Sequence, residues 1–242
     1  MKKQPRFSIP MLAALVLVAI PLLAQPPANL RLPALPSGAA AESLLDPEAA
    51  AWQAVPPLRV ALNRTPPLYD TDPPAAALVS LVEVRARRAG GQLVIHLAWA
   101  DASQDTASLA AAPATPPETR FVKEGTAATD RFFDAVAVMY PTVSGEALVT
   151  PSLQMGDPHN PVAIFYWDAA RGAVRMEAHG RETTKRTGET FAARGVYRAG
   201  RWQVTLVLPD LPAGVPLAFA VWNGSQLDRD GRKYFSVWHW LE

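Results

Sequence analysis

Few side chains in this sequence could bind a metal or a redox cofactor. The 242 residues contain no cysteine, which excludes disulfides, cysteine-ligated iron–sulfur clusters, zinc–thiolate sites and covalent C-x-x-C-H haem attachment. The remaining donor types are methionine, lysine, tyrosine, carboxylate and histidine, and the only histidines are His96, His159, His179 and His239. Any redox cofactor must therefore be held without a bond to cysteine sulfur.

The common enzymatic motifs are absent from the sequence. There is no G-x-G-x-x-G, no Walker loop, no H-E-x-x-H and no G-x-S-x-G, so nucleotide-binding and hydrolase functions lack their usual support. The run Asp228-Arg229-Asp230-Gly231 superficially resembles a calcium loop. It lacks the alternating carboxylates and the terminal glutamate of a 12-residue calcium site, which favours an ordinary polar turn.

Two loop segments contain the donor residues of most interest. Pro151 to Pro158 includes a Met-Gly-Asp-Pro run, and Gly224 to Lys233 is polar and rich in turn-forming residues. A methionine most often fills a gap in a hydrophobic core, and a lysine most often lies at the solvated surface. Residue type alone therefore leaves the roles of Met155 and Lys233 open. His159 is a rival donor on chemical grounds, because histidine is the commoner haem ligand.

The elements that must position these loops are β-strands. From residue 58 onward, short runs rich in β-branched and aromatic residues alternate with Pro, Gly and Asp. The clearest pair, 78–87 and 92–100, predicts a hairpin across two adjacent glycines. Further strands are predicted at 135–140, 162–167, 172–178, 189–197, 202–207, 217–222 and 234–240. The sequence thus predicts an all-β protein, an antiparallel β-sandwich with long ligand-binding loops and minor helical turns.

One helical turn is predicted ahead of the first strand. Asp46 is a good N-cap residue and Pro47 suits the first helical position, so Asp46-Pro47-Glu48 predicts a turn of helix. Trp52 would then dock on the core.

The composition fits one globular domain and excludes a general attraction to nucleic acid. Hydrophobic residues make up 49% of the chain and charged residues 19%, which is a globular balance. The 23 basic side chains are matched by 22 acidic ones, and no Lys/Arg-dense run with interleaved aromatics is present. We therefore expect no nucleic-acid partner.

The N-terminus has the layout of an export signal. Lys2, Lys3 and Arg6 precede an apolar run that ends at Ala24 and is shorter than the ~20 apolar residues that a spanning helix needs. We expect a periplasmic protein with no stable membrane span after processing, although an uncleaved N-terminal anchor is the alternative. The expected divisions are a signal peptide at 1–24, a Pro/Ala-rich tether at 25–40 and a β-sandwich domain at 41–242.

The two loop segments and their neighbours resemble a known family. The Met-Gly-Asp loop precedes a strand that ends in aromatic residues, Phe165-Tyr166-Trp167. A second block runs from Ala220-Val221-Trp222-Asn223-Gly224-Ser225 through the polar loop to Lys233, Ser236 and Trp238. In order and spacing, the blocks resemble the haem b-binding gamma subunits of the type II dimethylsulfoxide reductase family, the ethylbenzene dehydrogenase, dimethylsulfide dehydrogenase, selenate reductase and chlorate reductase group. With weaker matches, the resemblance covers most of residues 45–242.

The resemblance implies a non-catalytic electron-transfer subunit with a non-covalent haem b. Its axial ligands would be Met155 and Lys233, and Gly156, Tyr166 and Trp222 are candidate pocket residues. Methionine sulfur is a soft ligand that favours reduced iron and so raises the potential. Lysine must first lose its proton, which costs about 4–5 kcal/mol at neutral pH, and burial reduces that cost by lowering the pKa of the amine.

The resemblance also implies partners, and other functions stay open beside it. The implied partners are a molybdopterin-containing alpha subunit, an iron–sulfur beta subunit and a soluble c-type cytochrome, with the substrate and the direction of electron flow undecided. One alternative is a secreted carbohydrate-binding β-sandwich module that stacks exposed Trp and Tyr on sugars without a metal. Another is an iron-free structural subunit with the same fold. An isolated hydrolase lacks a nucleophile with an adjacent base.

Overall fold

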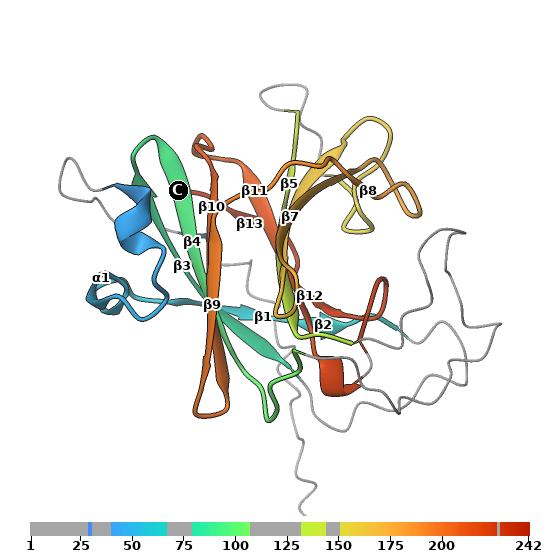
Figure 1. The fold of residues 1–242 in the computed structure, drawn as a ribbon. Coiled ribbons are helices and arrows are strands. Elements are labelled where there is room, and N and C mark those ends of the chain that lie inside the picture. Colours follow the sequence, from blue (N-terminus) through green and yellow to red (C-terminus); the bar gives the residue numbers. More distant parts are fainter. Residues whose placement is uncertain (1–28, 31–39, 67–78, 107–131, 144–150, 227) are drawn as a thin grey trace, which may run out of the picture.

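Two antiparallel β-sheets packed face to face make up the fold (Figure 1). The computed structural model describes residues 29–30, 40–66, 79–106, 132–143, 151–226 and 228–242. Every pairing between two of the strands in these ranges is antiparallel, and only the isolated bridge between Leu30 and Leu241 is parallel. The all-β antiparallel sandwich predicted from the sequence is therefore confirmed.

The first sheet has five strands in the order β1-β3-β4-β10-β9. Its members are β1 (Leu58–Ala61), β3 (Leu81–Ala89), β4 (Gln92–Ala100), β9 (Ala193–Arg198) and β10 (Arg201–Pro209). The predicted hairpin is confirmed, since β3 and β4 pair around Gly90 and Gly91, whose φ angles of 58° and 71° lie in the region that glycine adopts without strain.

The second sheet has eight strands, seven of them in the order β2-β12-β11-β5-β6-β7-β8, and β13 also pairs with β11. Its members are β2 (Asn63–Arg64), β5 (Ala135–Pro141), β6 (Val162–Asp168), β7 (Gly172–Ala178), β8 (Lys185–Arg186), β11 (Pro216–Trp222), β12 (Tyr234–Phe235) and β13 (His239–Trp240). This sheet carries both loops singled out from the sequence. They are the loop before β6 and the loop between β11 and β12.

Two strand predictions were wrong in extent. The predicted strand at 234–240 is two short strands, because Ser236 leaves the ladder and its hydroxyl accepts a hydrogen bond from the Phe219 amide (2.9 Å). The predicted strand at 189–197 begins only at Ala193. Its first residues follow β7 instead, where the Arg175 amide donates to the Glu189 carbonyl (3.1 Å), before the chain crosses to the first sheet.

Both faces of the central strands are buried. Alternate residues of the central strands fill the core between the sheets, and the intervening residues form a second apolar layer on each outer face. On β5, for example, Val136 and Val138 lie in the central core, whereas Ala135 and Ala137 lie on the outer face of the second sheet. Other segments of the chain must therefore pack over each outer face to shield it from solvent.

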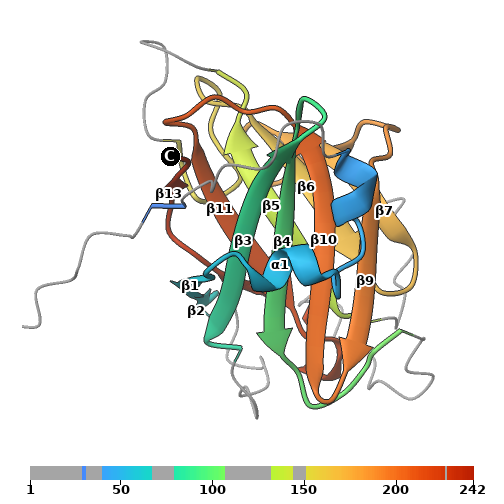
Figure 2. The ribbon, with the colours of Figure 1, turned by 90° about the vertical axis from the view of Figure 1, so that its left-hand side faces the viewer.

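Helical turns cover the outer face of the first sheet. Figure 2 shows α1 (Ala50–Gln53) lying across this sheet, and the 3-10 helix η1 (Ala41–Leu44) precedes it. Trp52 is buried there as predicted, and its indole donates to the Leu44 carbonyl (3.1 Å). The predicted helical turn at 46–48 is a bend and turn between these two helices, in which Asp46 accepts a hydrogen bond from the Glu48 amide (3.2 Å).

The N-terminal predictions lie mostly outside the described residues. The signal peptide (1–24) does so entirely, and of the tether (25–40) only residues 29, 30 and 40 are described. Leu30 is buried and pairs with Leu241, so this one residue packs against the sandwich. No helix in the described part of the chain is both long and apolar enough to cross a bilayer.

Gly195 on β9 provides a test of packing in the central core. A Cβ at this position would lie 2.3 Å from Cζ2 of Trp167, whose ring also packs edge-on against Trp202 at 5.3 Å. We expect Gly195→Ala to destabilise the protein by about 2–3 kcal/mol, because the indole must move within a packed core. Urea unfolding measures the change in the free energy of unfolding. Gly231→Ala is the control, since no atom lies within 4 Å of its added Cβ, and an equal effect of both substitutions would contradict the packing argument.

Candidate functional site

The candidate site lies on the outer face of the second sheet. Its floor is built from β5 and β11, which place alanines side by side: Ala137 pairs with Ala220, and Ala135 and Ala218 belong to the same apolar cluster. Trp222 and Trp238 belong to the same cluster and are buried with these alanines. The site therefore combines an apolar surface of small side chains with two indole rings.

Met155 reaches this face from a strained loop. Its φ angle is 71°, a left-handed conformation that costs a residue with a side chain about 1–2 kcal/mol. Gly156 follows with φ 73°, and its amide donates to the Ser152 carbonyl (2.9 Å) while the Met155 carbonyl accepts from the Gly180 amide (2.9 Å). Two successive left-handed residues turn the chain sharply and aim the thioether at the sheet. Strain of this kind concentrates at functional positions.

Asp157 holds the Met155 loop together, which the sequence reading did not foresee. Its carboxylate accepts hydrogen bonds from the His159 amide (3.0 Å), the Asn160 amide (3.0 Å) and the Asn160 side chain (3.1 Å). Desolvation would raise the pKa of Asp157, but these hydrogen bonds outweigh it and keep the pKa below the ordinary value. The Asp-Pro-x-Asn spacing was the available signal, since an aspartate often accepts bonds from the amides that follow it.

Lys233 approaches Met155 from the end of the loop between β11 and β12. Its Nζ lies 3.5 Å from Sδ of Met155 and 5.3 Å from the centre of the Trp222 ring. Its own carbonyl accepts hydrogen bonds from the amide (2.9 Å) and the hydroxyl (3.0 Å) of Thr65. The structure thus brings together two side chains that are 78 residues apart in the sequence.

The amine of Lys233 lies in surroundings that disfavour its charged form. Burial lowers its pKa from the ordinary value of 10.5 to about 8, and the charge of Asp230 opposes this shift. Among the described residues, no carboxylate lies within ion-pair distance of this amine. A neutral lysine is a donor to a metal, so burial makes the amine more available for coordination.

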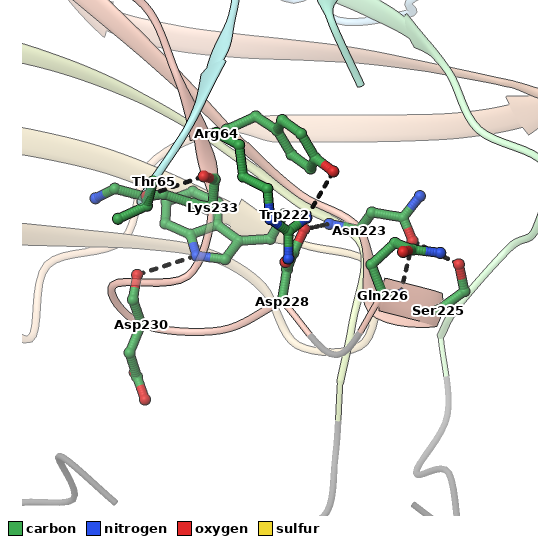
Figure 3. A network of polar contacts seen from close by, with 10 residues as sticks. Arg64, Thr65, Trp222, Asn223, Ser225, Gln226, Asp228, Asp230 and Lys233 are labelled. Atoms are coloured by element: carbon green, nitrogen blue, oxygen red, sulfur yellow. Dashed lines mark hydrogen bonds and ion pairs between the residues drawn. The ribbon is translucent and has the colours of Figure 1, made fainter. Parts of the chain in front are cut away.

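The loop from Gly224 to Lys233, here called the lysine loop, takes part in a polar network that joins it to Arg64 (Figure 3). Asp228 is 1% exposed and accepts a hydrogen bond from the Asn223 amide (3.2 Å), while the Arg64 guanidinium lies 3.4 Å from its other oxygen. Arg64 also donates to the Tyr234 hydroxyl (2.6 Å). Burial raises the pKa of Asp228 to about 6, against the opposing effects of the Asn223 amide and of Arg64. The sequence analysis interpreted Asp228 only as part of a polar turn and did not foresee this network.

The other predicted pocket residues occupy different positions. Trp222 is buried, its ring packs edge-on against Tyr166 at 5.4 Å, and its indole donates to the Asp230 carbonyl (3.2 Å). Tyr166 is half-buried at the edge of the same cluster, and Gly156 is buried beneath the Met155 turn. The rival donor His159 is exposed, and no described contact joins its imidazole to either donor.

Asp134 ties the lysine loop to the rest of the sandwich. Its carboxylate is fully buried and accepts hydrogen bonds from the Gly224 amide (2.9 Å), the Asp105 amide (2.7 Å) and the Trp202 indole (2.9 Å). Burial raises the pKa of Asp134. The sequence reading missed this role, for which the only local signal is a carboxylate directly before a strand. The start of the loop between β11 and β12 is thereby fixed to both sheets.

The chemistry of the donor set fits a haem better than a bare metal ion. In the described part of the chain, no three His, Cys, Asp or Glu side chains are grouped so that they could hold a metal ion. A thioether and an amine instead approach each other to 3.5 Å beside an apolar cluster that includes Trp222 and Trp238. A porphyrin supplies four ligands to its iron, so a haem would need only two further donors, and this thioether and the neutral form of this amine are suitable ones.

The fold and the site together define a β-sandwich that offers a thioether and an amine, from two loops, over the outer face of one sheet. A family model described as ethylbenzene dehydrogenase matches residues 49–191, more than half of the chain. The chain therefore belongs to this family. The matched segment includes Met155 and ends before Lys233.

Named relatives extend the similarity beyond that segment. Chlorate reductase subunit gamma of Ideonella dechloratans is 30% identical over 206 residues, which cover 80% of this chain and 77% of that protein. Dimethylsulfide dehydrogenase subunit gamma of Rhodovulum sulfidophilum is 26% identical over 233 residues, covering 86% and 77%. A Haloferax mediterranei protein named as a respiratory nitrate reductase heme subunit is 28% identical over 207 residues, covering 80% and 66%. The gamma-subunit resemblance seen in the sequence is confirmed.

Proposed function

We propose that this chain is a non-catalytic electron-transfer subunit that carries a non-covalent haem b, with Met155 and Lys233 as the axial ligands. The observation that carries the proposal is the 3.5 Å approach of the Lys233 amine to the Met155 sulfur. Both arrangements cost free energy, since the Met155 backbone is strained and the Lys233 amine is poorly solvated, and such costs are typical of functional positions. Two relatives are named as gamma subunits and a third as a heme subunit, which supports the same role.

The partners follow from the family. The relatives are named as subunits of chlorate reductase, dimethylsulfide dehydrogenase and nitrate reductase. We therefore propose a molybdopterin-containing alpha subunit and an iron–sulfur beta subunit as permanent partners. A soluble c-type cytochrome in the periplasm would exchange electrons with the haem. The catalytic partner sets the direction of electron flow.

Burial of the aromatic side chains argues against the carbohydrate-binding alternative. A sugar-stacking platform needs exposed Trp or Tyr rings. Among the described residues no aromatic side chain is exposed, and Val237 is the one large hydrophobic residue at the surface. Trp222 and Tyr166 instead pack on each other beside the lysine amine.

The absorption spectrum of the exported protein tests the proposal. We expect a Soret band with the sharp visible bands of low-spin haem after reduction, because two strong axial donors favour the low-spin state. Acid-acetone should extract the haem, since the chain has no cysteine for covalent attachment. Fractionation of the cells should place the haem protein in the periplasm. A colourless protein that also fails to bind added haem would overturn the proposal.

A further inference from the structure

We propose that Arg64, Asp228 and Thr65 are positioning residues that restrain the backbone around Lys233 and so keep its amine at the site. These three residues are called the clamp. This inference rests on the proposed role of Lys233 as an iron ligand. It assigns a function to the two-residue strand β2 and to Thr65, which follows it and lies 168 positions before Lys233.

The clamp acts on the backbone of the lysine itself. Thr65 follows β2 directly and gives both its amide and its hydroxyl to the Lys233 carbonyl, at 2.9 and 3.0 Å. β2 also pairs with β12, where Arg64 is opposite Tyr234, the residue after the lysine. Thr65 and β2 therefore fix the main chain at Lys233 and Tyr234.

Arg64 links the middle of the lysine loop to the first residue of β12. One of its terminal nitrogens donates to the hydroxyl of Tyr234 (2.6 Å), which is 1% exposed, and the other lies 3.4 Å from buried Asp228. The guanidinium also lies 5.2 Å from the centre of the Tyr234 ring. A planar fork can reach both partners at once, whereas a lysine has a single nitrogen to offer. As Figure 3 shows, these contacts gather on one side of the loop while the Lys233 side chain extends away beside Trp222.

This arrangement has a physical consequence for coordination. A lysine side chain has many rotamers, and each free backbone residue adds more, so an unrestrained amine spends most of its time away from any given point. Fixing the backbone at Lys233 leaves only the side chain to be ordered when it binds iron. Loss of the clamp should therefore release the amine more often, by about tenfold, without removing any donor atom.

Acylation of Lys233 in the haem-loaded full chain tests the clamp. An amine-reactive ester modifies only an unbound, neutral amine, and mass spectrometry compares Lys233 with Lys185, an exposed lysine on β8 that serves as the internal standard. We expect Arg64→Leu to raise the Lys233/Lys185 acylation ratio by about tenfold. The matched control is Arg59→Leu on β1, an exposed arginine that is remote from the loop in sequence, and it should leave the ratio unchanged.

Two further variants separate positioning from folding. Arg64→Leu leaves the Asp228 carboxylate buried without its cation and can fail to fold, whereas Arg64→Leu with Asp228→Asn removes both charges. The double variant should recover thermal stability and keep the high acylation ratio, which a purely structural role would not predict. Thr65→Val removes one of the two bonds to the Lys233 carbonyl and should raise the ratio in the same direction.

The outcomes distinguish the clamp from the ligand itself. If haem binds and protects Lys233 in the wild type but the ratio stays unchanged in Thr65→Val and in every folded Arg64 variant, the clamp is overturned and the ligand role stands. If the wild-type ratio is the same with and without haem, the ligand role fails and the clamp falls with it.

Discussion

Replacing Lys233 by Leu should abolish six-coordinate low-spin haem and, at the same time, stabilise the haem-free protein. On the proposed ligation, leucine fills similar space and offers no donor, so the iron keeps only the Met155 sulfur. A thioether alone is a weak ligand, and the spectrum should become that of five-coordinate, high-spin haem. Loss of one coordinate bond should weaken haem binding by at least about 100-fold, which corresponds to about 2.7 kcal/mol.

The gain in stability has a separate cause. The amine of Lys233 lies in a poorly solvated position without an ion-pair partner among the described residues, and its contact with the Trp222 ring only partly compensates for this. Removing it should raise the free energy of unfolding of the haem-free protein by about 1 kcal/mol at neutral pH. Lys185→Leu, at an exposed position on β8, is the control for loss of a positive charge.

The lowered pKa of Lys233 makes the free energy of unfolding of the haem-free protein depend on pH. Burial lowers the pKa of Lys233 to about 8 in the folded chain, below the 10.5 of an exposed lysine. Between these values the unfolded chain binds more protons, so this group makes the haem-free protein more stable as the pH rises from 8 towards 10.5. Below pH 8 its full destabilising effect is present. Lys233→Leu should remove this dependence, and urea titrations at pH 7 and pH 10 measure it. If the free energy of unfolding changed equally between pH 7 and pH 10 in the wild type and the variant, the buried amine would not be the cause.

Much of the architecture could be predicted from the sequence because it depends on local patterns. The hairpin of β3 and β4 follows from alternation around two glycines, and the central strands follow from short apolar runs. Two of the shortest strands, β2 and β8, were missed, since they hold two residues each and form only by pairing with their neighbours. The break after Phe235 likewise depends on Ser236, whose hydroxyl replaces a ladder bond, and this is a tertiary effect.

The candidate site could be predicted in part for a different reason. Met155 and Lys233 were named through resemblance, because neither residue type is unusual by itself. The supporting residues could not be found in that way. Arg64 and Asp134 act through partners that are far away in the sequence, and their carboxylate or guanidinium chemistry is common at any protein surface. The nearly continuous apolar character of β5 and β11 was a usable signal that both faces of the second sheet are covered.

Gly156→Ala should disrupt the site through the backbone, without removing any donor atom. The φ angle of Gly156 is 73°, and an added Cβ would lie 2.6 Å from the Asn160 carbonyl oxygen and 3.0 Å from Cγ1 of Val162. The first of these contacts is with backbone, so it cannot be relieved by a side-chain rotation. The left-handed strain of about 1–2 kcal/mol and the steric overlap of about 1–3 kcal/mol act together, and the loop before β6 must change its path.

The change in path carries the Met155 sulfur away from the lysine amine. Because Gly156 and Met155 share one turn, a shift of the first moves the second, and the Met155 carbonyl then loses its bond from Gly180. On the proposed ligation, we expect haem affinity to fall by about 100-fold while Lys233 remains able to bind, which spectral titration with haem measures. Gly91→Ala is the matched control, since its φ of 71° gives the same strain with no atom within 4 Å of the added Cβ. Haem affinity unchanged in Gly156→Ala would mean that the Met155 turn does not position an axial ligand.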